Sequence, residues 1–298
     1  MWHTCVIGAK ETGIQNSNEW RQQLQYMLRR DMMNKVISKD GTEIAFEQSG
    51  RGDAVIIVPG ALGTRSHPQW IQLAGLLSEH FTVINYDRRG RGDSGDTLPY
   101  TVQREIEDIE ALIDSAGGSA YVYGISSGAI LALEAADRLA GKVRKLALYE
   151  PPLILDYSRP PLPEDYVEQI QAAIGAGNRG KAVEVFMTQA LLIPEEYLAP
   201  MKADPMWQEM EETAHTLVYD GMISREVMAG KPLPAGKWSS ITAATLAIHG
   251  DQSEPMFRDA AQAVADRVKH AEYMALTGQG HDVSPDAIAP VLADFFKA

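Results

Sequence analysis

The stretch YVYGISSGAILALEAA, residues 121–136, decides the fold. Its first residues form an aliphatic and aromatic run typical of a buried strand, and its last residues have the small and aliphatic side chains of a helix. Between them lies the pattern Gly-x-Ser-x-Gly, formed by Gly124, Ser126 and Gly128. A strand that turns sharply into a helix needs small residues on both sides, because the two backbones approach closely there. The stretch therefore predicts that Ser126 stands on a strained turn, with its hydroxyl exposed at the edge of a sheet.

Ser126 is the candidate nucleophile, since Ser127 would require a glycine at position 125, which is Ile. A serine hydroxyl reacts only when a nearby base accepts its proton. We predict that this base is His281, which follows the last predicted strand in the segment LTGQGHDVSP (276–285). The alternatives are a glycine-rich turn without a nucleophile and a surface histidine. The other histidines fit the position less well: His3, His67, His80, His215, His249 and His270.

The rest of the chain, 298 residues of which 45% are apolar, has the texture of a globular α/β protein. Helical patterns alternate with aliphatic runs that lack polar–apolar alternation, which is typical of a parallel sheet buried on both faces. These runs are AVIIV (54–58), TVINY (82–86), AYVYG (120–124) and KLALY (145–149). The turn signal Asp40-Gly41 predicts a hairpin before them. Strand texture returns at TLAIH (245–249) and EYMAL (272–276).

The domain organisation follows from where this texture begins, stops and returns. The first residues lack the alternation of strand-like runs and helical patterns. After the fourth run this alternation is replaced by helical stretches broken by prolines. A closing helix is expected to start at Ser284-Pro285. We predict an N-terminal extension (1–34), a first part of the core (35–151), a helical insertion (152–240) and a second part of the core (241–298).

Charge and cysteine content limit the partners and the compartment. The formal net charge of −13 is unfavourable for binding nucleic acids and anionic membranes, since both attract positive surfaces. No apolar run approaches the roughly 18 residues that cross a bilayer, and the first residues lack the order of a secretory signal. The one cysteine, Cys5, has no partner for an internal disulfide. We expect a soluble, cytoplasmic protein that acts on a small molecule, and the sequence carries no signal for its oligomeric state.

A substrate carbonyl that gains negative charge needs hydrogen-bond donors already in place, which form an oxyanion hole. The backbone N–H of Ser127, the residue after the nucleophile, is one candidate. The second is expected from the loop PGALGTRS (59–66), where Ala61 has the most suitable position. The alternative is that this loop only connects a strand to a helix.

The strand order, the turn at Ser126, the segment YDRRGRGDSG (86–95) and the Gly-x-Gly-His motif at 278–281 together resemble the α/β-hydrolase superfamily. The resemblance covers both predicted parts of the core, and the insertion stands where that family has its helical cap. It implies an α/β fold with an eight-stranded, mostly parallel sheet flanked by helices, a Ser–His–acid triad and no cofactor; no metal site is predicted. The Asp-Arg-Arg-Gly-Arg-Gly part of the segment resembles a family turn that is structural rather than catalytic.

Two positions depart from the family pattern. Many members carry His-Gly before the oxyanion donor, where this chain has Pro59-Gly60. The usual acid stands three residues after a glycine that follows the seventh strand, and here that position is Ser253, which cannot serve.

We therefore predict that the triad acid is Glu150, with Asp251 as the alternative. Glu150 directly follows the run KLALY, the other place where this superfamily puts its acid, and Pro151-Pro152 stiffens the chain after it. Asp251 comes one residue after Gly250, two short of the usual position, so its side chain is expected to point elsewhere. A structural ion pair is the other interpretation of Glu150.

The serine nucleophile excludes the aspartyl-ester routes of haloalkane dehalogenases and epoxide hydrolases in the same superfamily. Acyl transfer to water through an acyl-enzyme on Ser126 remains, as in a carboxylesterase-like serine hydrolase. The bond can be a carboxylester, lactone, thioester or carbon–carbon bond. The rival interpretations are a lyase or cofactor-free oxygenase on the same fold, and a non-catalytic small-molecule receptor. Seven large side chains of the insertion indicate either an apolar pocket or packing of the cap: Met187, Met201, Met206, Trp207, Met210, Tyr219 and Met222.

Overall fold

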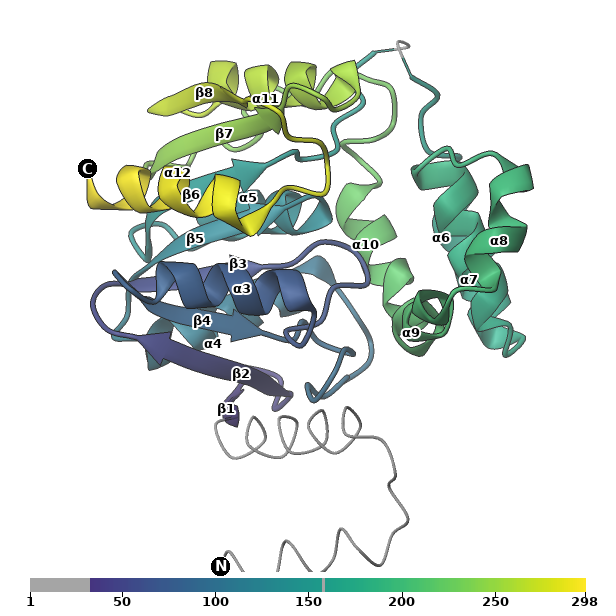
Figure 1. The fold of residues 1–298 in the computed structure, drawn as a ribbon, viewed down its shortest axis with the longest axis horizontal. Helices are drawn as coiled ribbons and strands as arrows, with labels where there is room; N and C mark the ends of the chain where they lie inside the picture. Colours follow the sequence, from purple (N-terminus) through teal and green to yellow (C-terminus); the bar gives the residue numbers. More distant parts are fainter. Residues whose placement is uncertain (1–32, 157–158) are drawn as a thin grey trace, which may run out of the picture. The chain divides into compact units, whose positions relative to one another are not determined.

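A computed structural model describes residues 33–156 and 159–298, and this part of the chain forms one eight-stranded sheet. The strands lie in the order β1-β2-β4-β3-β5-β6-β7-β8 across the sheet (Figure 1). β2 runs antiparallel to β4, and the neighbours from β4 to β8 are parallel. The prediction of an eight-stranded, mostly parallel sheet is confirmed. The predicted N-terminal extension lies, up to residue 32, outside the described residues.

The strand bounds agree with the runs expected from the sequence. The strands are β1 (Met33–Ile37), β2 (Glu43–Gly50), β3 (Ala54–Val58), β4 (Thr82–Tyr86), β5 (Ala120–Ile125), β6 (Val143–Tyr149), β7 (Ala244–Gly250) and β8 (Ala271–Leu276). The predicted turn between the first two is present: Gly41 has φ +87°, and Oδ1 of Asp40 accepts a hydrogen bond from the N–H of Thr42 at 3.0 Å. A positive φ is a conformation that glycine adopts without steric cost.

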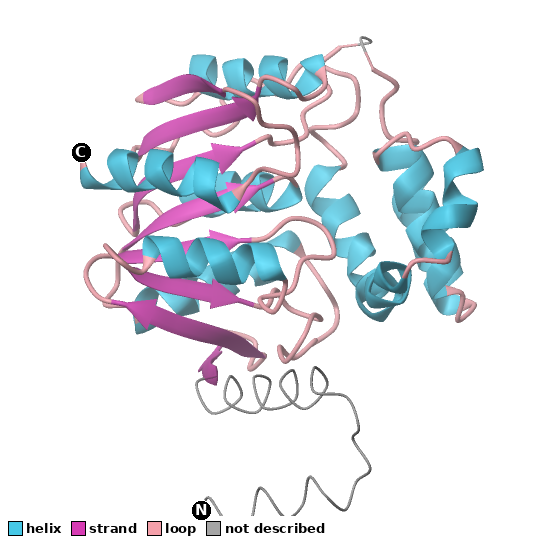
Figure 2. Ribbon diagram, viewed as in Figure 1, coloured by secondary structure: helices cyan, strands magenta, loops and turns pink. Residues whose placement is uncertain are grey.

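Helices cover both faces of the sheet, and each face has its own apolar core (Figure 2). One face carries α3 (Pro68–Leu77) and α12 (Pro285–Lys297), and the other carries α4 (Val102–Ser115), α5 (Ser127–Arg138) and α11 (Pro255–Arg267). Successive residues of a strand point to opposite faces. Within β3, Val55 and Ile57 accordingly join the first core, whereas Ile56 and Val58 join the second. Both cores come from strands without polar alternation, as expected for a doubly covered parallel sheet.

The residues between β6 and β7 form helices that lie beyond the carboxyl ends of the parallel strands (Figure 1). Helix α10 packs against α5 and α4 of the core and against α6. The helices are α6 (Tyr166–Gly175), α7 (Arg179–Val185), α8 (Leu198–Lys202), α9 (Pro205–Thr213) and α10 (Leu217–Ser224), with a π-helical turn at Phe186–Ala190 and 3₁₀ turns at Glu195–Tyr197 and Ala214–Thr216. These helices therefore lie beyond the edge of the sheet where Ser126 stands.

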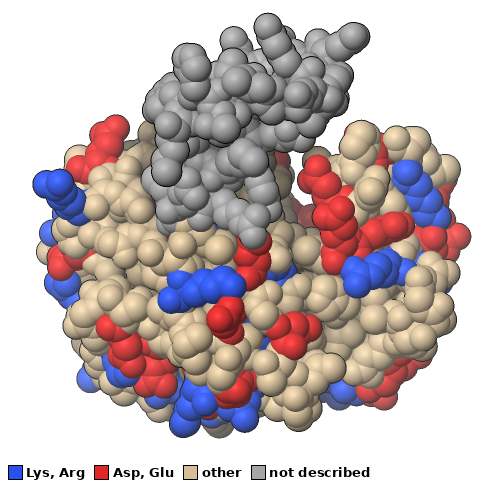
Figure 3. Space-filling view, turned by 90° about the horizontal axis from the view of Figure 1, so that it is seen from below, with Lys and Arg blue, Asp and Glu red and all other residues tan. Residues whose placement is uncertain are grey.

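None of the helices in the described ranges is both long and apolar enough to cross a membrane. On the face of the molecule seen in Figure 3, lysines and arginines are interspersed with acidic side chains. That face therefore offers no uniformly positive surface. The expectation that the chain does not act on nucleic acid stays a prediction.

Candidate active site

Ser126 forms the turn between β5 and α5. Its φ of +54° and ψ of −129° are a conformation that costs a non-glycine residue about 1–3 kcal/mol. The two flanking glycines are needed because other backbones approach them closely. An added Cβ at Gly128 would overlap the carbonyl oxygens of Val58 and Pro59, and one at Gly124 would lie 2.5 Å from the carbonyl oxygen of Gly128. The turn has the strained geometry that the sequence pattern predicts.

Neighbouring strands bring Ser126 and Glu150 to the same edge of the sheet. The N–H of Ser126 donates to the carbonyl oxygen of Tyr149 at 2.9 Å, and the N–H of Glu150 donates to that of Ile248 at 2.9 Å. Glu150 is fully buried and has φ +50°, so the residue after β6 is strained like the residue after β5. Strain at two adjacent strand ends is typical of a functional site.

The carboxylate of Glu150 contacts His281, which comes from the loop after β8. Its Oε2 lies 2.7 Å from Nδ1 of His281, and its Oε1 accepts a hydrogen bond from the N–H of Gly250 at 2.7 Å. A carboxylate at Nδ1 favours the tautomer whose Nε2 is free to accept a proton. Glu150 has no exposed side-chain surface, whereas 40% of the His281 side chain is exposed.

Asp251, the alternative acid, has a different set of partners. Its Oδ1 accepts hydrogen bonds from the N–H of Gly278 at 2.8 Å and from the amide of Gln252 at 3.0 Å. Its own N–H donates to the carbonyl oxygen of Leu276 at 3.1 Å. Asp251 thus joins the end of β7 to the turn after β8, and its carboxylate contacts that turn rather than His281.

Two aromatic residues position the loop of His281. The hydroxyl of Tyr149 donates to the carbonyl oxygen of Gly280 at 2.6 Å. The ring of Phe257 stacks on the imidazole of His281, with centroids 4.7 Å apart and planes 19° from parallel. The imidazole therefore has Glu150 at its Nδ1 and an aromatic ring on one face.

The loop at residues 59–62 lies against Ser126. An added Cβ at Gly60 would be 3.7 Å from Oγ of Ser126, and Ala61 lines the same cavity as that serine. The carbonyl oxygen of Gly60 accepts a hydrogen bond from Nη1 of Arg91 at 2.6 Å. Because a trans peptide is planar, the N–H of Ala61 points to the side opposite Arg91. The N–H of Ser127, at the start of α5, has no acceptor within its own helix.

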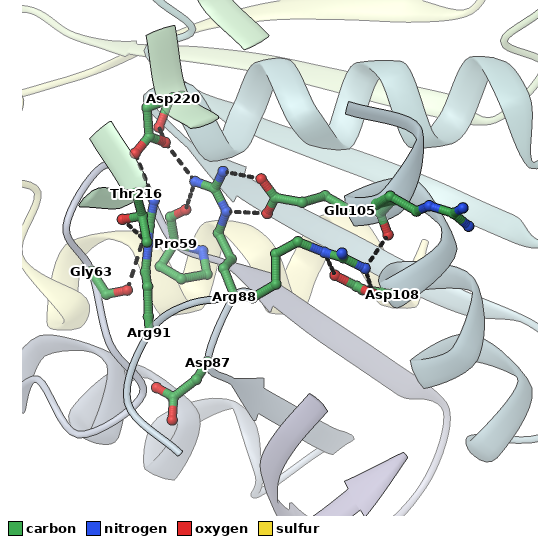
Figure 4. A network of polar contacts seen from close by, with 12 residues as sticks. Pro59, Gly63, Asp87, Arg88, Arg91, Glu105, Asp108, Thr216 and Asp220 are labelled. Atoms are coloured by element: carbon green, nitrogen blue, oxygen red, sulfur yellow. Dashed lines mark hydrogen bonds and ion pairs between the residues drawn. The ribbon is translucent and has the colours of Figure 1, made fainter. Parts of the chain in front are cut away.

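Two buried arginines, each 1% exposed, connect this loop to the insertion (Figure 4). Asp220 of α10 lies between them: Oδ1 accepts from Nη1 of Arg88 at 2.7 Å, and Oδ2 accepts from Nη2 of Arg91 at 2.6 Å. Arg88 also donates two hydrogen bonds of 2.7 Å to Glu105 and one of 3.3 Å to the carbonyl oxygen of Pro59. The turn that the resemblance identified as structural therefore contacts the carbonyl groups next to Ser126.

Asp220 stays ionised in this network and reaches the turn of Ser126. Burial raises the pKa of Asp220, but the charges of Arg91 and Arg88 outweigh it and leave the pKa below its ordinary value. Oδ1 of Asp220 also accepts the hydroxyl of Ser127 at 2.8 Å. Asp220 carries no signal in the sequence, because no local spacing relates a carboxylate on an inserted helix to a serine 93 residues earlier.

Ser126 and His281 line one cavity of about 180 Å³. In the described part of the chain, no hydrogen bond joins the two side chains. The apolar residues of the wall are Ala61, Pro152, Leu162, Phe186, Ala190, Leu191, Met228, Met256 and Phe257. None of the seven large side chains that the sequence analysis singled out lines this cavity. Met187, Trp207 and Tyr219 are buried in the packing of the insertion, whereas Met206 and Met222 are exposed, so the packing interpretation holds for the first three.

The fold has clear relatives among known proteins. The model of the Alpha/beta hydrolase family matches residues 55–293. The structure of an alpha/beta hydrolase from Sphaerobacter thermophilus DSM 20745 is similar, with 49% sequence identity and a TM-score of 0.80 over 88% of this chain and 100% of that chain. The enol-lactonase from Burkholderia xenovorans LB400 is similar in fold, with 20% identity and a TM-score of 0.64 over 89% of this chain and 100% of that chain.

Among curated proteins, the proline iminopeptidase PfmaB of Pestalotiopsis fici is 28% identical over 121 residues, which are 39% of this chain and 43% of that protein. The chain spans less than half the length of the curated relatives that it matches. The family model, by contrast, extends over most of the chain, and the resemblance inferred from the sequence is confirmed. The chain belongs to the alpha/beta hydrolase family.

Proposed function

We propose that this chain is a serine hydrolase that cleaves an ester-like bond of a small molecule through an acyl-enzyme on Ser126. In this proposal His281 is the base and Glu150 is the acid that orients it. The observation that carries the proposal is the 2.7 Å contact between Nδ1 of His281 and the buried Oε2 of Glu150. This histidine lines the same cavity as Ser126.

The proposed reaction has two parts. Oγ of Ser126 attacks the substrate carbonyl carbon while its proton passes to Nε2 of His281, and the charge of Glu150 stabilises the imidazolium that forms. His281 then gives the proton to the leaving oxygen as the ester bond breaks, which leaves an acyl group on Ser126. A water molecule, activated by His281 in the same way, attacks that acyl group and regenerates the serine.

The N–H groups of Ala61 and Ser127 are the proposed donors to the oxyanion. Support comes from the hydrogen bond between Arg91 and the carbonyl oxygen of Gly60, which fixes the direction of the Ala61 N–H before any substrate binds. Donors that need no reorganisation are the ones that lower the barrier, and removal of one such donor typically costs about 10²–10³ in kcat.

The experiment that tests the function is labelling with a fluorophosphonate probe, followed by mass analysis of the labelled peptide. We expect the wild-type protein to be labelled at Ser126. The matched control Ser126→Ala should not be labelled, should melt at the wild-type temperature and should lose about 10⁴–10⁶ in kcat. A set of p-nitrophenyl esters of increasing acyl length should then show the highest kcat/KM for short acyl chains, because the cavity is small.

Folded wild-type protein that resists the probe would contradict the proposal. So would labelling at a residue other than Ser126, or ester turnover by Ser126→Ala above roughly a tenth of the wild-type rate.

A further inference from the structure

Arg159, on the segment between β6 and α6, lines the cavity that contains Ser126 and His281. Among the described residues that form the wall it is the one lysine or arginine, and only 8% of it is exposed. A guanidinium is charged at all accessible pH values and is costly to bury without acceptors. Its presence in a mostly apolar wall therefore requires an explanation.

The partners of Arg159 do not satisfy its guanidinium group. Nη2 donates to the carbonyl oxygen of Ala190 at 2.8 Å. Nε lies 3.3 Å from Oε2 of Glu254, which is close enough for an ion pair. In the described part of the chain, however, neither Nε nor Nη1 has a hydrogen-bond acceptor, although both atoms are buried. A buried donor without an acceptor loses its hydration and gains nothing in exchange.

Arg88 and Arg91, the two buried arginines that contact Asp220, have no such deficit. Arg88 donates from Nε and Nη2 to Glu105 and from Nη1 to Asp220, and Arg91 donates from all three nitrogens. The chain therefore supplies full sets of acceptors to Arg88 and Arg91. Arg159 differs from them both in its unused donors and in its place on the cavity wall.

Glu254 is a weak partner for this charge. Its side chain is 55% exposed, and its Oε2 lies 3.3 Å from Nε of Arg159 without forming a hydrogen bond to it. Exposed ion pairs contribute little because water competes for both charges. The carbonyl oxygen of Ala190 thus accepts from Nη2, Glu254 lies near Nε without a hydrogen bond, and Nη1 keeps both of its N–H groups for another acceptor.

We propose that Arg159 binds a free carboxylate of the substrate, so that the enzyme cleaves half-esters, or the corresponding lactones, of small acids that carry a second carboxylate. This inference rests on the proposed hydrolase function. Arginine suits the task because its N–H groups match carboxylate oxygens in geometry and their hydrogen bonds are charge-assisted. The apolar wall then surrounds the short carbon chain between the scissile ester and the carboxylate, which itself is not changed by the reaction.

The binding test uses Ser126→Ala protein, so that no turnover is needed. Titration calorimetry compares monoethyl glutarate with its neutral isostere, ethyl 4-carbamoylbutanoate. We expect the half-ester to bind at least about tenfold more tightly, as one charge-assisted contact predicts. A second change, Arg159→Gln, should abolish the difference. The matched control is Arg225→Gln, because Arg225 has the same charge, is 56% exposed, pairs with Glu168 and does not line this cavity.

The turnover test measures the hydrolysis of both esters by protein with an intact Ser126. Arg159→Gln should raise KM for the half-ester by about 10–100-fold, leave its kcat within about threefold, and change KM for the amide by less than about threefold. Arg159→Lys keeps the charge but lacks the planar set of N–H groups. Its KM for the half-ester should therefore lie between those of wild type and Arg159→Gln. Glu254→Gln removes a negative charge beside the proposed site and should lower KM for the half-ester.

Equal affinity for the half-ester and the amide overturns the inference, and so does a preference that survives Arg159→Gln. The inference is also overturned if Arg225→Gln removes the preference for the half-ester as fully as Arg159→Gln does. That result would mean that long-range charge, rather than a direct contact with Arg159, causes the preference. If Arg159→Gln does not fold, Arg159→Lys and Glu254→Gln decide, and KM values unchanged from wild type overturn the inference.

Fluorophosphonate labelling of Ser126 separates the two proposals. Labelled protein without a carboxylate preference means that the carboxylate site is wrong and the hydrolase function stands. Unlabelled protein that binds the half-ester through Arg159 means that the hydrolase function is wrong and the carboxylate site stands.

Discussion

The hydroxyl of Ser127 donates a hydrogen bond to Oδ1 of Asp220 over 2.8 Å, so the residue that starts α5 is bonded to helix α10 of the insertion. Asp220 also binds Arg88 and Arg91, whose side chains contact the carbonyl oxygens of Pro59 and Gly60. One buried carboxylate therefore connects the insertion, the turn of Ser126 and the loop of the proposed oxyanion donors.

Asp220→Asn is expected to destabilise the protein strongly. The change leaves two guanidinium groups, each 1% exposed, without the charge that compensates them. Removal of one partner of a buried ion pair typically costs about 3–5 kcal/mol, which corresponds to a fall in Tm on the order of 10 °C in a chain of this size. Thermal unfolding at neutral pH measures the change. The control is Asp114→Asn, because Asp114 is exposed and pairs with Lys142 at the surface, where such a pair contributes about 0–1 kcal/mol.

The stabilisation by Asp220 should also depend on pH. Since the pKa of Asp220 in the folded protein lies below its ordinary value of about 4, the folded state holds the proton less tightly than the unfolded state does. The stabilisation is therefore present above about pH 4 and is lost as the pH falls through the lower pKa of the folded state. The difference in Tm between wild type and Asp220→Asn should shrink as the pH is lowered from 7 to 3. A difference that stays constant over this range would contradict the assignment of the charge.

Gly250→Ala is expected to displace the loop of His281. An added Cβ at Gly250 would overlap the carbonyl oxygen of Gln279 and lie 2.7 Å from the hydroxyl of Tyr149. A shift of about 1 Å in a catalytic group can cost about 10² in rate, so we expect kcat to fall by about that factor. The control is Gly280→Ala on the same loop, where an added Cβ meets no atom within 4 Å, and its kcat should fall far less. Equal losses in the two variants would mean that loop flexibility, rather than the close approach, is what matters.

The features that the sequence predicts well are set by local geometry or by strand order. The turn at Ser126 is marked by two glycines, since only glycine fits where α5 approaches the backbone of β5, at Gly124, and the end of β3, at Gly128. Glu150 follows directly from β6, which pairs with β5 in parallel and thereby brings the two residues to one edge. A pattern of adjacent residues is enough to predict both.

The features that the sequence does not predict depend on contacts between distant segments. Asp220 is one of many acidic residues in the insertion, and its role arises only because α10 packs against α5 and α4. Arg159 lies on a proline-rich connection whose path no periodicity defines. The cavity wall likewise comes from residues such as Phe257 and Met228, whereas the aromatic and methionine side chains that stood out in the sequence are elsewhere. Tertiary packing selects such residues, and a single sequence does not encode that selection locally.

The variant His281→Ala tests His281 as the base. The imidazole accepts the proton of Ser126 at Nε2, and a side chain without that nitrogen leaves the serine hydroxyl unactivated. His281→Ala should lose as much activity as Ser126→Ala, since members of such a triad act as a unit. Hydrolysis of a p-nitrophenyl ester at pH 8 measures the loss. Turnover by His281→Ala above roughly a tenth of the wild-type rate would exclude His281 as the base.

The choice between the two candidate acids is tested by Glu150→Gln and Asp251→Asn, made separately. Oε1 and Oε2 of Glu150 have different partners, the N–H of Gly250 and Nδ1 of His281. A glutamine that keeps its oxygen on Gly250 presents its NH₂ group to Nδ1, which forces the proton onto Nε2 and prevents that nitrogen from accepting the proton of Ser126.

An isosteric amide at the acid position of a serine protease costs about 10⁴ in kcat for the same reason, and we expect Glu150→Gln to lose at least about 10². Asp251→Asn keeps the oxygen that accepts from Gly278 at 2.8 Å, so its kcat should fall by less than about tenfold and its Tm should change little. The kcat values of the two variants on one ester, measured at pH 8 on protein of checked Tm, give the ranking. The reverse ranking would reassign the acid to Asp251, and two small effects would mean that Ser126 and His281 act as a dyad without a carboxylate.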